Sequence, residues 1–310
     1  MLNPFRRKQA ATKRTAIVCT QSGCTMATVS TGPAGRPAVD VCVSFTGGAA
    51  EQRAALSSWL GQDRGDGSAI SCVLDPDDYQ MLLVEAPDVL PAEIKAAVRW
   101  RLKDLIDYPV ADAVIDVFPI PEPARRSSAK MMYAIAARRH AIEQQVAVMR
   151  GASAALDVID IPELALRNVA AKLPEAAQGL IFLWVNDDSA QLFVIKGEMI
   201  YLSRQVSFPA EGFAAPDSTD GHVEAVSLEL QRSMDYFESH YEQAPIAHLV
   251  IAPGDERARR LQAALADQTS LDIQTLDLRR AVDTADASWS ADRRSVLAIG
   301  AAMRQTPRRA

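Results

Sequence analysis

The amino-acid sequence predicts a two-lobed α/β protein, and three observations support that prediction. The chain has 310 residues, the length of two ordinary domains or of one large α/β unit. Each half opens with three strand-like segments joined by short turns, within residues 15–45 and 179–206. Each set of strands is followed by further helical and strand-like segments, the arrangement from which α/β lobes are built.

In the first half, short runs of apolar and β-branched residues between Gly-rich and polar turns predict the strands. A helix is predicted where Leu56, Trp59 and Leu60 share one face. We expect strands at 15–20, 24–30, 39–45, 69–74 and 79–84, and this helix at 49–60.

Residues 90–150 predict a small α+β module that interrupts the first lobe. Apolar residues recur at helical spacing from Ile94 to Ile106, so a helix is expected at 90–106. Pro109 ends it, because the residue before a proline avoids the helical region. Strands are then expected at 113–118 and 130–137, and a helix at 138–150.

The second half repeats the plan of the first. Strands are expected at 156–161, 179–185, 190–195, 198–206, 246–251 and 271–276, with helices from 162 and at 223–241, 255–266 and 293–303. The predicted organisation is a basic tail (1–14), a first lobe (15–89 and 151–175), an inserted α+β subdomain (90–150), a second lobe (176–304) and a basic tail (305–310).

The charges are unevenly placed. The chain has 33 basic and 39 acidic residues, and removing the five basic residues of the first 14 leaves 28 against 39, or −11. An acidic body disfavours nucleic acid as the main ligand. The basic head, with Phe5, Arg6, Arg7 and Lys8, suits contact with an anionic membrane surface. The chain shows neither a spanning apolar run nor a secretory signal, so we expect a cytoplasmic protein.

The sequence offers no metal site and no catalytic motif. Asp157 and Asp160 are interpreted as capping or solvated residues rather than as an acid/base pair. No GxSxG, Walker or HExxH motif occurs. The histidines are scattered and the cysteines form no CxxC pair, so the thiols are expected to be reduced. These residues are His140, His222, His240 and His248, and Cys19, Cys24, Cys42 and Cys72.

Four segments carry a family resemblance. Residues 78–87, 93–110 (EIKAAVRWRLKDLIDYPV) and 116–118 resemble the MshI proteins of mannose-sensitive haemagglutinin (MSHA) pilus biogenesis. These are similar to the PilM proteins of type IV pilus assembly, which share the actin-like fold of FtsA. Residues 229–237 (ELQRSMDYF) also resemble a PilM helix. The resemblance covers about residues 15 to 304. It implies a duplicated, ribonuclease H-like actin fold.

An actin-like fold implies a nucleotide cleft between the lobes. Two hairpin loops rich in glycine and hydroxyl groups approach the phosphates there, and a carboxylate near each loop holds Mg²⁺. The resemblance places these roles on Thr20, Ser22 and Gly23 in the first hairpin, Asn186, Asp187 and Ser189 in the second, and Gly254 in a later turn.

The sequence departs from the family pattern in all three loops. The first hairpin lacks the Asp-x-Gly of PilM-like proteins, and the second has no glycine but two adjacent acids, Asp187 and Asp188. The third keeps one glycine of two, and Pro253 removes an N–H donor. We therefore expect a degenerate cleft and no efficient hydrolysis. Weak binding of ATP with Mg²⁺, and plain structural turns, both stay open.

The PilM resemblance also implies a partner, the cytoplasmic N-terminal peptide of an inner-membrane protein of the PilN type. In that family the peptide lies in a groove between the inserted subdomain and the first lobe. Trp100, Leu105 and Tyr108 are the candidate groove residues, since such grooves need apolar pockets rimmed by polar groups. The alternative for Trp100 is ordinary core packing.

Three functions compete. The first is an actin-like scaffold of a type IV pilus machine at the inner membrane. The second is an actin-fold ATPase or sugar-kinase relative, which the degenerate loops disfavour. The third is a domain like the cytoplasmic part of the type II secretion L component, whose following membrane span is not found in this sequence.

Overall fold

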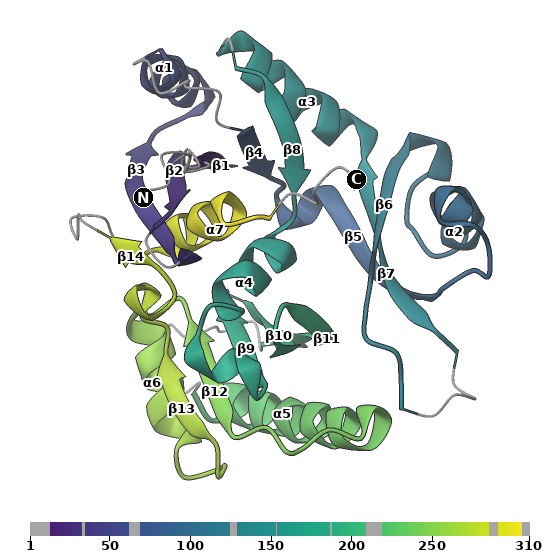
Figure 1. The fold of residues 1–310 in the computed structure, drawn as a ribbon. Helices are drawn as coiled ribbons and strands as arrows, with labels where there is room; N and C mark the ends of the chain where they lie inside the picture. Colours follow the sequence, from purple (N-terminus) through teal and green to yellow (C-terminus); the bar gives the residue numbers. More distant parts are fainter. Residues whose placement is uncertain are drawn as a thin grey trace, which may run out of the picture.

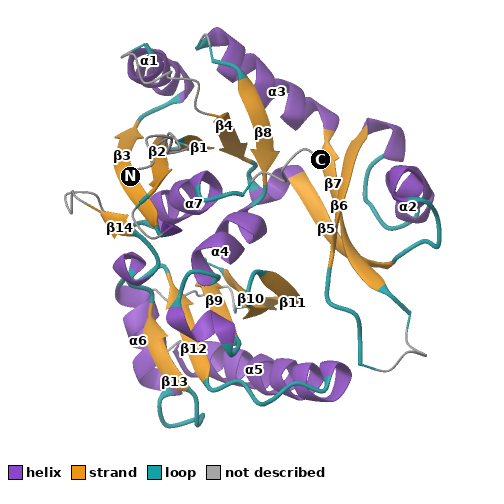
Figure 2. Ribbon diagram, in the orientation of Figure 1, coloured by secondary structure: helices purple, strands orange, loops and turns teal. Residues whose placement is uncertain are grey.

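A computed structural model describes residues 13–32, 35–61, 69–124, 129–152, 154–186, 188–208, 219–284 and 291–305 of the chain. These residues form α-helices and three β-sheets (Figures 1 and 2). The helices are α1 (Ala49–Leu60), α2 (Ile94–Leu102), α3 (Arg139–Gly151), α4 (Pro162–Ala170), α5 (Thr219–Tyr241), α6 (Glu256–Leu265) and α7 (Arg293–Ala302). The strands are β1 (Arg14–Thr20), β2 (Gly23–Thr31), β3 (Pro37–Thr46), β4 (Ala69–Val73), β5 (Tyr79–Glu85), β6 (Ala113–Pro119), β7 (Met131–Arg138), β8 (Leu156–Asp160), β9 (Leu180–Val185), β10 (Ser189–Lys196), β11 (Met199–Ser207), β12 (His248–Ala252), β13 (Asp272–Thr275) and β14 (Asp283–Thr284).

The two large sheets share one topology. The first lobe has the strand order β14-β3-β2-β1-β4-β8, and the second has β11-β10-β9-β12-β13. In each, an antiparallel meander of three strands is followed by two strands parallel to the first strand of that meander. Apart from the short β14, the second lobe repeats the first strand for strand. The predicted duplicated, two-lobed architecture is confirmed.

Strand β9 shows why the centre of each lobe forms as it does. All six of its residues are buried, as expected for a strand whose sheet is covered on both faces. Because side chains alternate along a strand, Phe182 and Trp184 enter the core shared with α4 and α7. Ile181 and Leu183 enter the core that α5 and α6 close on the opposite face.

Helices α4 and α7 cross between the lobes. Helix α4 leads the chain from the first lobe to the second. The chain returns at β14, which joins the first-lobe sheet, and α7 then packs on that sheet and on α4 (Figure 1). They meet where Gly300 lies against the backbone of Ala165, so closely that a Cβ atom on Gly300 would overlap the Ala165 carbonyl oxygen. Asn168 Nδ2 adds a hydrogen bond of 2.9 Å to Gly300 O. The absence of a side chain at Gly300 sets the distance between the two helices.

The predicted second lobe, 176–304, is wrong at its end. Helix α7 lies on the first-lobe sheet and contacts β1, β2, β3 and β4. Strand β14 also pairs with β3, with Asp283 opposite Ala38. The apolar face of α7, including Val296 and Ile299, is buried in the core that joins the lobes. Helical periodicity predicts that this face is buried but does not identify the sheet that covers it.

The inserted subdomain begins earlier than predicted. Its sheet has the order β5-β7-β6, and β5 pairs along its length with β7, from Tyr79↔Ala137 to Glu85↔Met131. The boundary at 90 is therefore wrong. Helix α3, at the predicted end of the insert, packs on both neighbours: Ile142 lies against Ile135 and Ala137 of β7, and Met149 enters the first-lobe core. Antiparallel pairing of strands distant in sequence decides the first boundary, and α3 joins the insert to the first lobe at the second.

Helix α2 is shorter than the predicted helix at 90–106. Pro91–Glu93 form a 3₁₀ turn before it, and α2 ends at Leu102. Beyond it the chain reverses toward β6. Arg99 stabilises this reversal, because its Nη1 donates a hydrogen bond of 2.7 Å to Val110 O.

The inserted sheet also touches the second lobe. The backbone N–H of Ser203 donates to the Tyr133 hydroxyl oxygen at 2.9 Å. The backbone N–H of Ala124 donates to His240 O, at the end of α5, at 3.1 Å. The subdomain is therefore fastened at both lobes.

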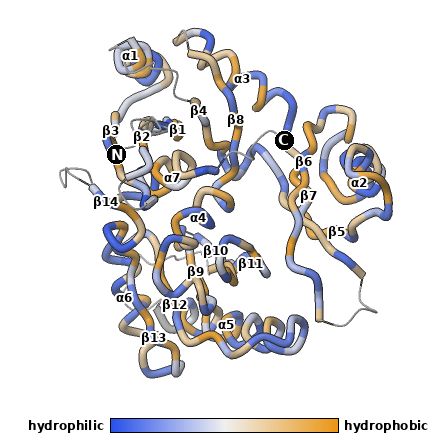
Figure 3. The backbone as a smooth tube through the Cα atoms, in the orientation of Figure 1, coloured by the Kyte–Doolittle hydropathy of each residue, from blue (hydrophilic) through white to orange (hydrophobic). Residues whose placement is uncertain are grey.

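Hydropathy follows this packing. Blue and orange alternate along α5 in Figure 3, as expected of a helix with one buried face. Among the helices of the described ranges, none is both long and apolar enough to cross a membrane.

The α4–α7 contact predicts an unusual effect of alanine in a helix. Glycine to alanine inside a helix normally stabilises by up to about 1 kcal/mol. At Gly300 the new methyl group would push against the Ala165 carbonyl, and overpacking of this kind costs about 1–3 kcal/mol. We expect Gly300→Ala to lower the free energy of unfolding, measured by urea denaturation.

The matched control is Gly151→Ala, at the end of α3. A Cβ atom there would have no atom within 4 Å. This variant should be neutral or slightly stabilising. If both variants stabilise equally, the proposed role of the Gly300 contact is wrong.

Candidate functional site

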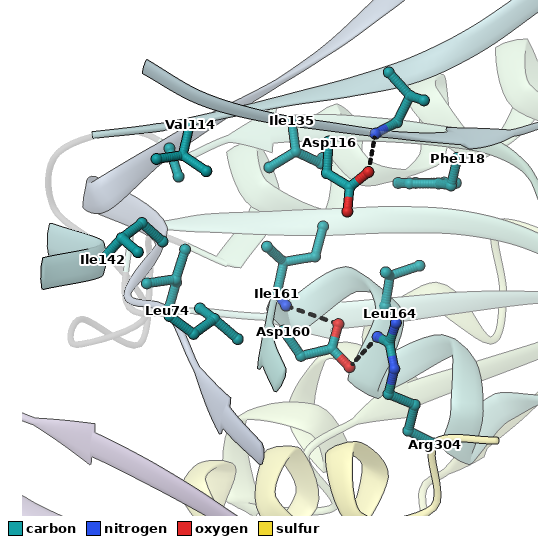
Figure 4. Close-up of a pocket in the computed structure, with 13 residues that line it drawn as sticks. Leu74, Val114, Asp116, Phe118, Ile135, Ile142, Asp160, Ile161, Leu164 and Arg304 are labelled. Carbon is teal, nitrogen blue, oxygen red and sulfur yellow. Dashed lines mark hydrogen bonds and ion pairs between the residues drawn. The ribbon is translucent and has the colours of Figure 1, made fainter. Parts of the chain in front are cut away.

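A pocket of about 280 Å³ lies between the inserted sheet and the first lobe (Figure 4). It is bordered by β6 and β7 on one side and by β4, β8 and the start of α4 on the other. Its lining is mostly apolar with two carboxylates and one guanidinium. The lining residues are Leu74, Val114, Asp116, Val117, Phe118, Ile135, Ala137, Ile142, Ile159, Asp160, Ile161, Leu164 and Arg304.

Alternation along β6 builds one wall of this pocket. Ala113 and Ile115 are buried on the face of the sheet that α2 covers. Val114, Asp116 and Phe118 line the pocket from the other face. The seven residues of β6 therefore bury one face in a small core and line the pocket with the other face.

A buried ion pair forms the floor of the pocket. The side chain of Asp160 is 1% exposed, and its Oδ2 accepts a hydrogen bond of 2.9 Å from Arg304 Nη1. Its Oδ1 accepts from the backbone N–H of Ile161 at 3.0 Å. A buried carboxylate must be paired in this way because burial removes its hydration. The interpretation of Asp160 as a capping or solvated residue is wrong.

Arg304 has a different role from the one that its position near the C-terminal end suggests. It follows α7, and the return of that helix to the first lobe brings it beside the β8–α4 junction (Figure 4). It is an internal partner of Asp160 rather than part of a basic appendage. The two residues are 144 positions apart, so no local pattern could have paired them.

The second carboxylate of the pocket is exposed. Asp116 Oδ1 lies 2.7 Å from Lys95 Nζ on α2, and both side chains are more than half exposed. An exposed pair of this kind adds little to stability. It places an ion-paired carboxylate beside the apolar wall of the pocket.

A further polar contact fastens the inserted sheet to α4. The Tyr79 hydroxyl donates to Glu163 Oε2 at 2.6 Å. Burial is the main reason that the pKa of Glu163 and the pKa of Tyr79 both lie above their ordinary values. The contact joins the first residue of β5 to the first turn of α4.

The predicted nucleotide residues of the first hairpin bond locally. Thr20 Oγ1 lies 3.2 Å from Ser22 Oγ and donates to Gly23 O at 3.2 Å. Gln52 Nε2 donates to Thr20 O at 2.9 Å, so α1 braces the tip. A Cβ atom on Gly23 would overlap the carbonyl oxygen of Phe45, so close packing accounts for this glycine.

The second hairpin is closed by its own contacts. The N–H of Asn186 donates to Ser189 O at 2.7 Å, and Ser189 Oγ donates to Asp188 Oδ1 at 3.0 Å. Asp187 lies outside the described residues. Gly254 precedes α6, where a Cβ atom would overlap the Leu276 carbonyl oxygen.

These three loops do not fit Mg·ATP well. A triphosphate site needs N–H donors aimed outward and a carboxylate for the metal. The first hairpin turn, Thr-Gln-Ser-Gly, contains no carboxylate, and its hydroxyls bond to each other and to the backbone. The glycines at 23 and 254 are both explained by backbone contacts.

The predicted groove residues do not line the pocket. Trp100 is 77% and Leu105 55% exposed, and α2 covers the face of the sheet opposite the pocket. The core alternative for Trp100 is also wrong. Tyr108 donates from its hydroxyl to Ala136 O at 2.7 Å and lies under the Arg138 guanidinium. The predicted membrane-contact residues Phe5, Arg6, Arg7 and Lys8 lie outside the described residues.

The buried ion pair predicts a stability effect. Arg304→Met keeps an unbranched apolar stem but removes the guanidinium, and so leaves the Asp160 carboxylate with a backbone donor alone among the contacts described above. An unsatisfied buried acceptor costs about 1–3 kcal/mol, and we expect that loss in the free energy of unfolding by denaturant titration. Lys95→Met breaks the exposed pair with Asp116 and should change stability by less than about 0.5 kcal/mol. Equal losses of stability in the two variants would contradict the assignment of Asp160 and Arg304 as a buried ion pair.

Comparisons with known proteins agree with the topology. The chain matches no protein-family model and no curated protein. Among solved structures, it is similar to a chain of a PilM–PilN type IV pilus biogenesis complex, with 18% identity, a TM-score of 0.69 and coverage of 94% of this chain and 97% of that chain. The cytoplasmic domain of EpsL, an inner-membrane component of the type II secretion system of Vibrio cholerae, gives 12% identity, a TM-score of 0.49 and coverage of 95% and 96%. A protein from Bacteroides thetaiotaomicron with an actin-like ATPase fold gives 7% identity, a TM-score of 0.49 and coverage of 89% and 94%. The duplicated sheet order and the likeness to the pilus complex together show that the chain has a PilM-like, actin-like fold.

Proposed function

We propose that this chain is a cytoplasmic scaffold of a type IV pilus machine of the MSHA (MshI) type. It docks the cytoplasmic N-terminal peptide of a PilN-type inner-membrane protein, which holds it at the inner face of that membrane. The observation that carries the proposal is the apolar pocket between the inserted sheet and the first lobe.

The borders of the pocket suit an extended peptide. Strands β6 and β8 are edge strands of their two sheets, and both contribute residues to the lining. An edge strand offers backbone groups with which an added strand can pair, while apolar recesses receive alternate side chains of the peptide. Val114 and Ile142 supply an apolar surface of this kind, and Asp116 lies at its rim.

The likeness to a known complex supports the same partner. The similar structure is named as a complex of PilM with PilN, and its chain matches this one over nearly its whole length. Common fold does not by itself carry function to this chain. The pocket supplies the independent reason, because it is large enough for side chains and lies where the resemblance implies a peptide groove.

We also propose that the nucleotide cleft is degenerate, with weak or no binding of ATP and no efficient hydrolysis. The support is the local hydrogen bonding of Thr20 and Ser22 and the lack of a carboxylate in the first hairpin turn. The protein then acts as a binding platform rather than as an enzyme.

Peptide docking can be measured with a fluorescently labelled N-terminal peptide of the PilN-type protein from the same cell, followed by anisotropy. Val114 is 36% exposed and borders the pocket, so a glutamate there should be tolerated by the fold. We expect Val114→Glu to weaken binding at least about tenfold, equivalent to about 1.4 kcal/mol, because it places a charge against an apolar peptide side chain.

Trp100→Glu is the matched control, since it adds the same charge on the far face of the inserted sheet. It should leave the affinity unchanged. If Trp100→Glu weakened peptide binding and Val114→Glu did not, the docking site would lie on α2. No binding of the peptide to folded protein would refute the docking proposal.

The nucleotide proposal predicts a negative result with a positive control. Calorimetric titration with Mg·ATP should show no micromolar binding, and phosphate release should not exceed the buffer rate, while an active actin-fold ATPase gives both signals in the same assay. Micromolar binding with turnover that Asp187→Ala abolishes would show an ATPase instead.

A further inference from the structure

Two cysteines face each other at the tip of the β1–β2 hairpin. Cys19 and Cys24 are directly opposite in the antiparallel register, one pair below the closing pair Thr20↔Gly23. The turn has two residues, so the closing pair is hydrogen-bonded and the next pair is the closer, non-hydrogen-bonded kind. Opposite Cα atoms of such a pair are about 4.5 Å apart, within the range of about 4.4–6.8 Å that a disulfide spans.

The two thiols already interact. The interaction between the two thiols is the main reason that the pKa of Cys19 lies above its ordinary value and the pKa of Cys24 below it. The positive charge of Arg294, on α7, also favours the Cys24 thiolate. Cys24 is buried, whereas Cys19 is half-buried and gives the pair access to solvent at the hairpin tip. The register therefore places one sulfur with a lowered pKa directly across the strand pair from a second sulfur that keeps its proton.

The other two cysteines lack this arrangement. Burial raises the pKa of Cys42 to about 11 and the pKa of Cys72 to about 12. Cys72 is on β4, opposite Ile17 rather than opposite Cys19. Cys42, on β3, pairs with Ala27 of β2. Neither stands directly across a strand pair from another cysteine.

We propose that Cys19 and Cys24 are a reversible redox pair that hydrogen peroxide closes into a disulfide across the hairpin. The Cys24 thiolate attacks one peroxide oxygen, which gives a sulfenic acid and hydroxide. The Cys19 sulfur then attacks the Cys24 sulfur, the S–O bond breaks, and water leaves with the Cys19 proton. Two thiols lose two electrons and peroxide is reduced to two waters. A dithiol reductant reverses the bond by exchange.

The bond has a defined structural effect. It would cross-link β1 to β2 directly below Thr20 and Gly23, and so fix the hairpin tip that Gln52 braces from α1. This site is separate from the peptide pocket, which is bordered by β4, β6, β7 and β8. Peptide docking therefore neither requires nor tests the redox pair.

The test uses the full, folded chain exposed to hydrogen peroxide. Free thiols are then alkylated with iodoacetamide under denaturing conditions, the protein is reduced with dithiothreitol, and new thiols are labelled with N-ethylmaleimide. We expect a mass loss of two hydrogen atoms after oxidation. Fragmentation should place maleimide on Cys19 and Cys24, and acetamide on Cys42 and Cys72.

Variants separate the pair from general oxidation. Cys19→Ser should prevent the mass loss of two hydrogen atoms, because Cys24 then has no cysteine opposite it across the strand pair. Cys72→Ser should leave the disulfide unchanged. A bond from Cys24 to Cys72 or Cys42, equal oxidation of all four thiols, or no disulfide in the folded wild-type chain would each overturn the proposal.

Discussion

The close crossing of α4 and α7 at Gly300 is the contact on which the rest of the structure depends. Helix α4 leads from the first lobe to the second and α7 packs on the first-lobe sheet, so the spacing of the two helices fixes how the two duplicated sheets meet. The same crossing builds the floor of the pocket, because Asp160 precedes α4 and Arg304 follows α7. A longer side chain at Gly300 would therefore act on stability and on the shape of the candidate site together.

Local patterns predicted the elements well, but long-range pairing decided the assembly. The apolar run 180–185 identified β9, and turn residues separated the strands of both meanders. The pairing of β5 with β7 and the return of α7 to the first lobe depend on which apolar faces cover one another. Arg304 and Asp160 show the limit most clearly, since a pair 144 residues apart has no signal in one sequence.

The candidate site shows how ambiguous single residues are. Gly23 and Gly254 match positions where an actin-like fold approaches phosphate, yet each lies against a backbone carbonyl that excludes a side chain. Trp100 belongs to a segment that carries the family resemblance, yet it is exposed on α2 and is not among the residues that line the pocket. The informative pattern was the alternation in β6, where Asp116 stands between Val114 and Phe118 on one face.

The inserted sheet has hydrogen bonds to both lobes, through Tyr79 to α4 and through Tyr133 to β11. The inserted sheet therefore bridges the two lobes. A hinge motion that separates the lobes must either break the Tyr133–Ser203 hydrogen bond or tilt the inserted sheet. Because β6 forms a wall of the pocket, the tilt would change its width. The relative position of the two lobes and the width of the pocket are thus coupled by geometry alone.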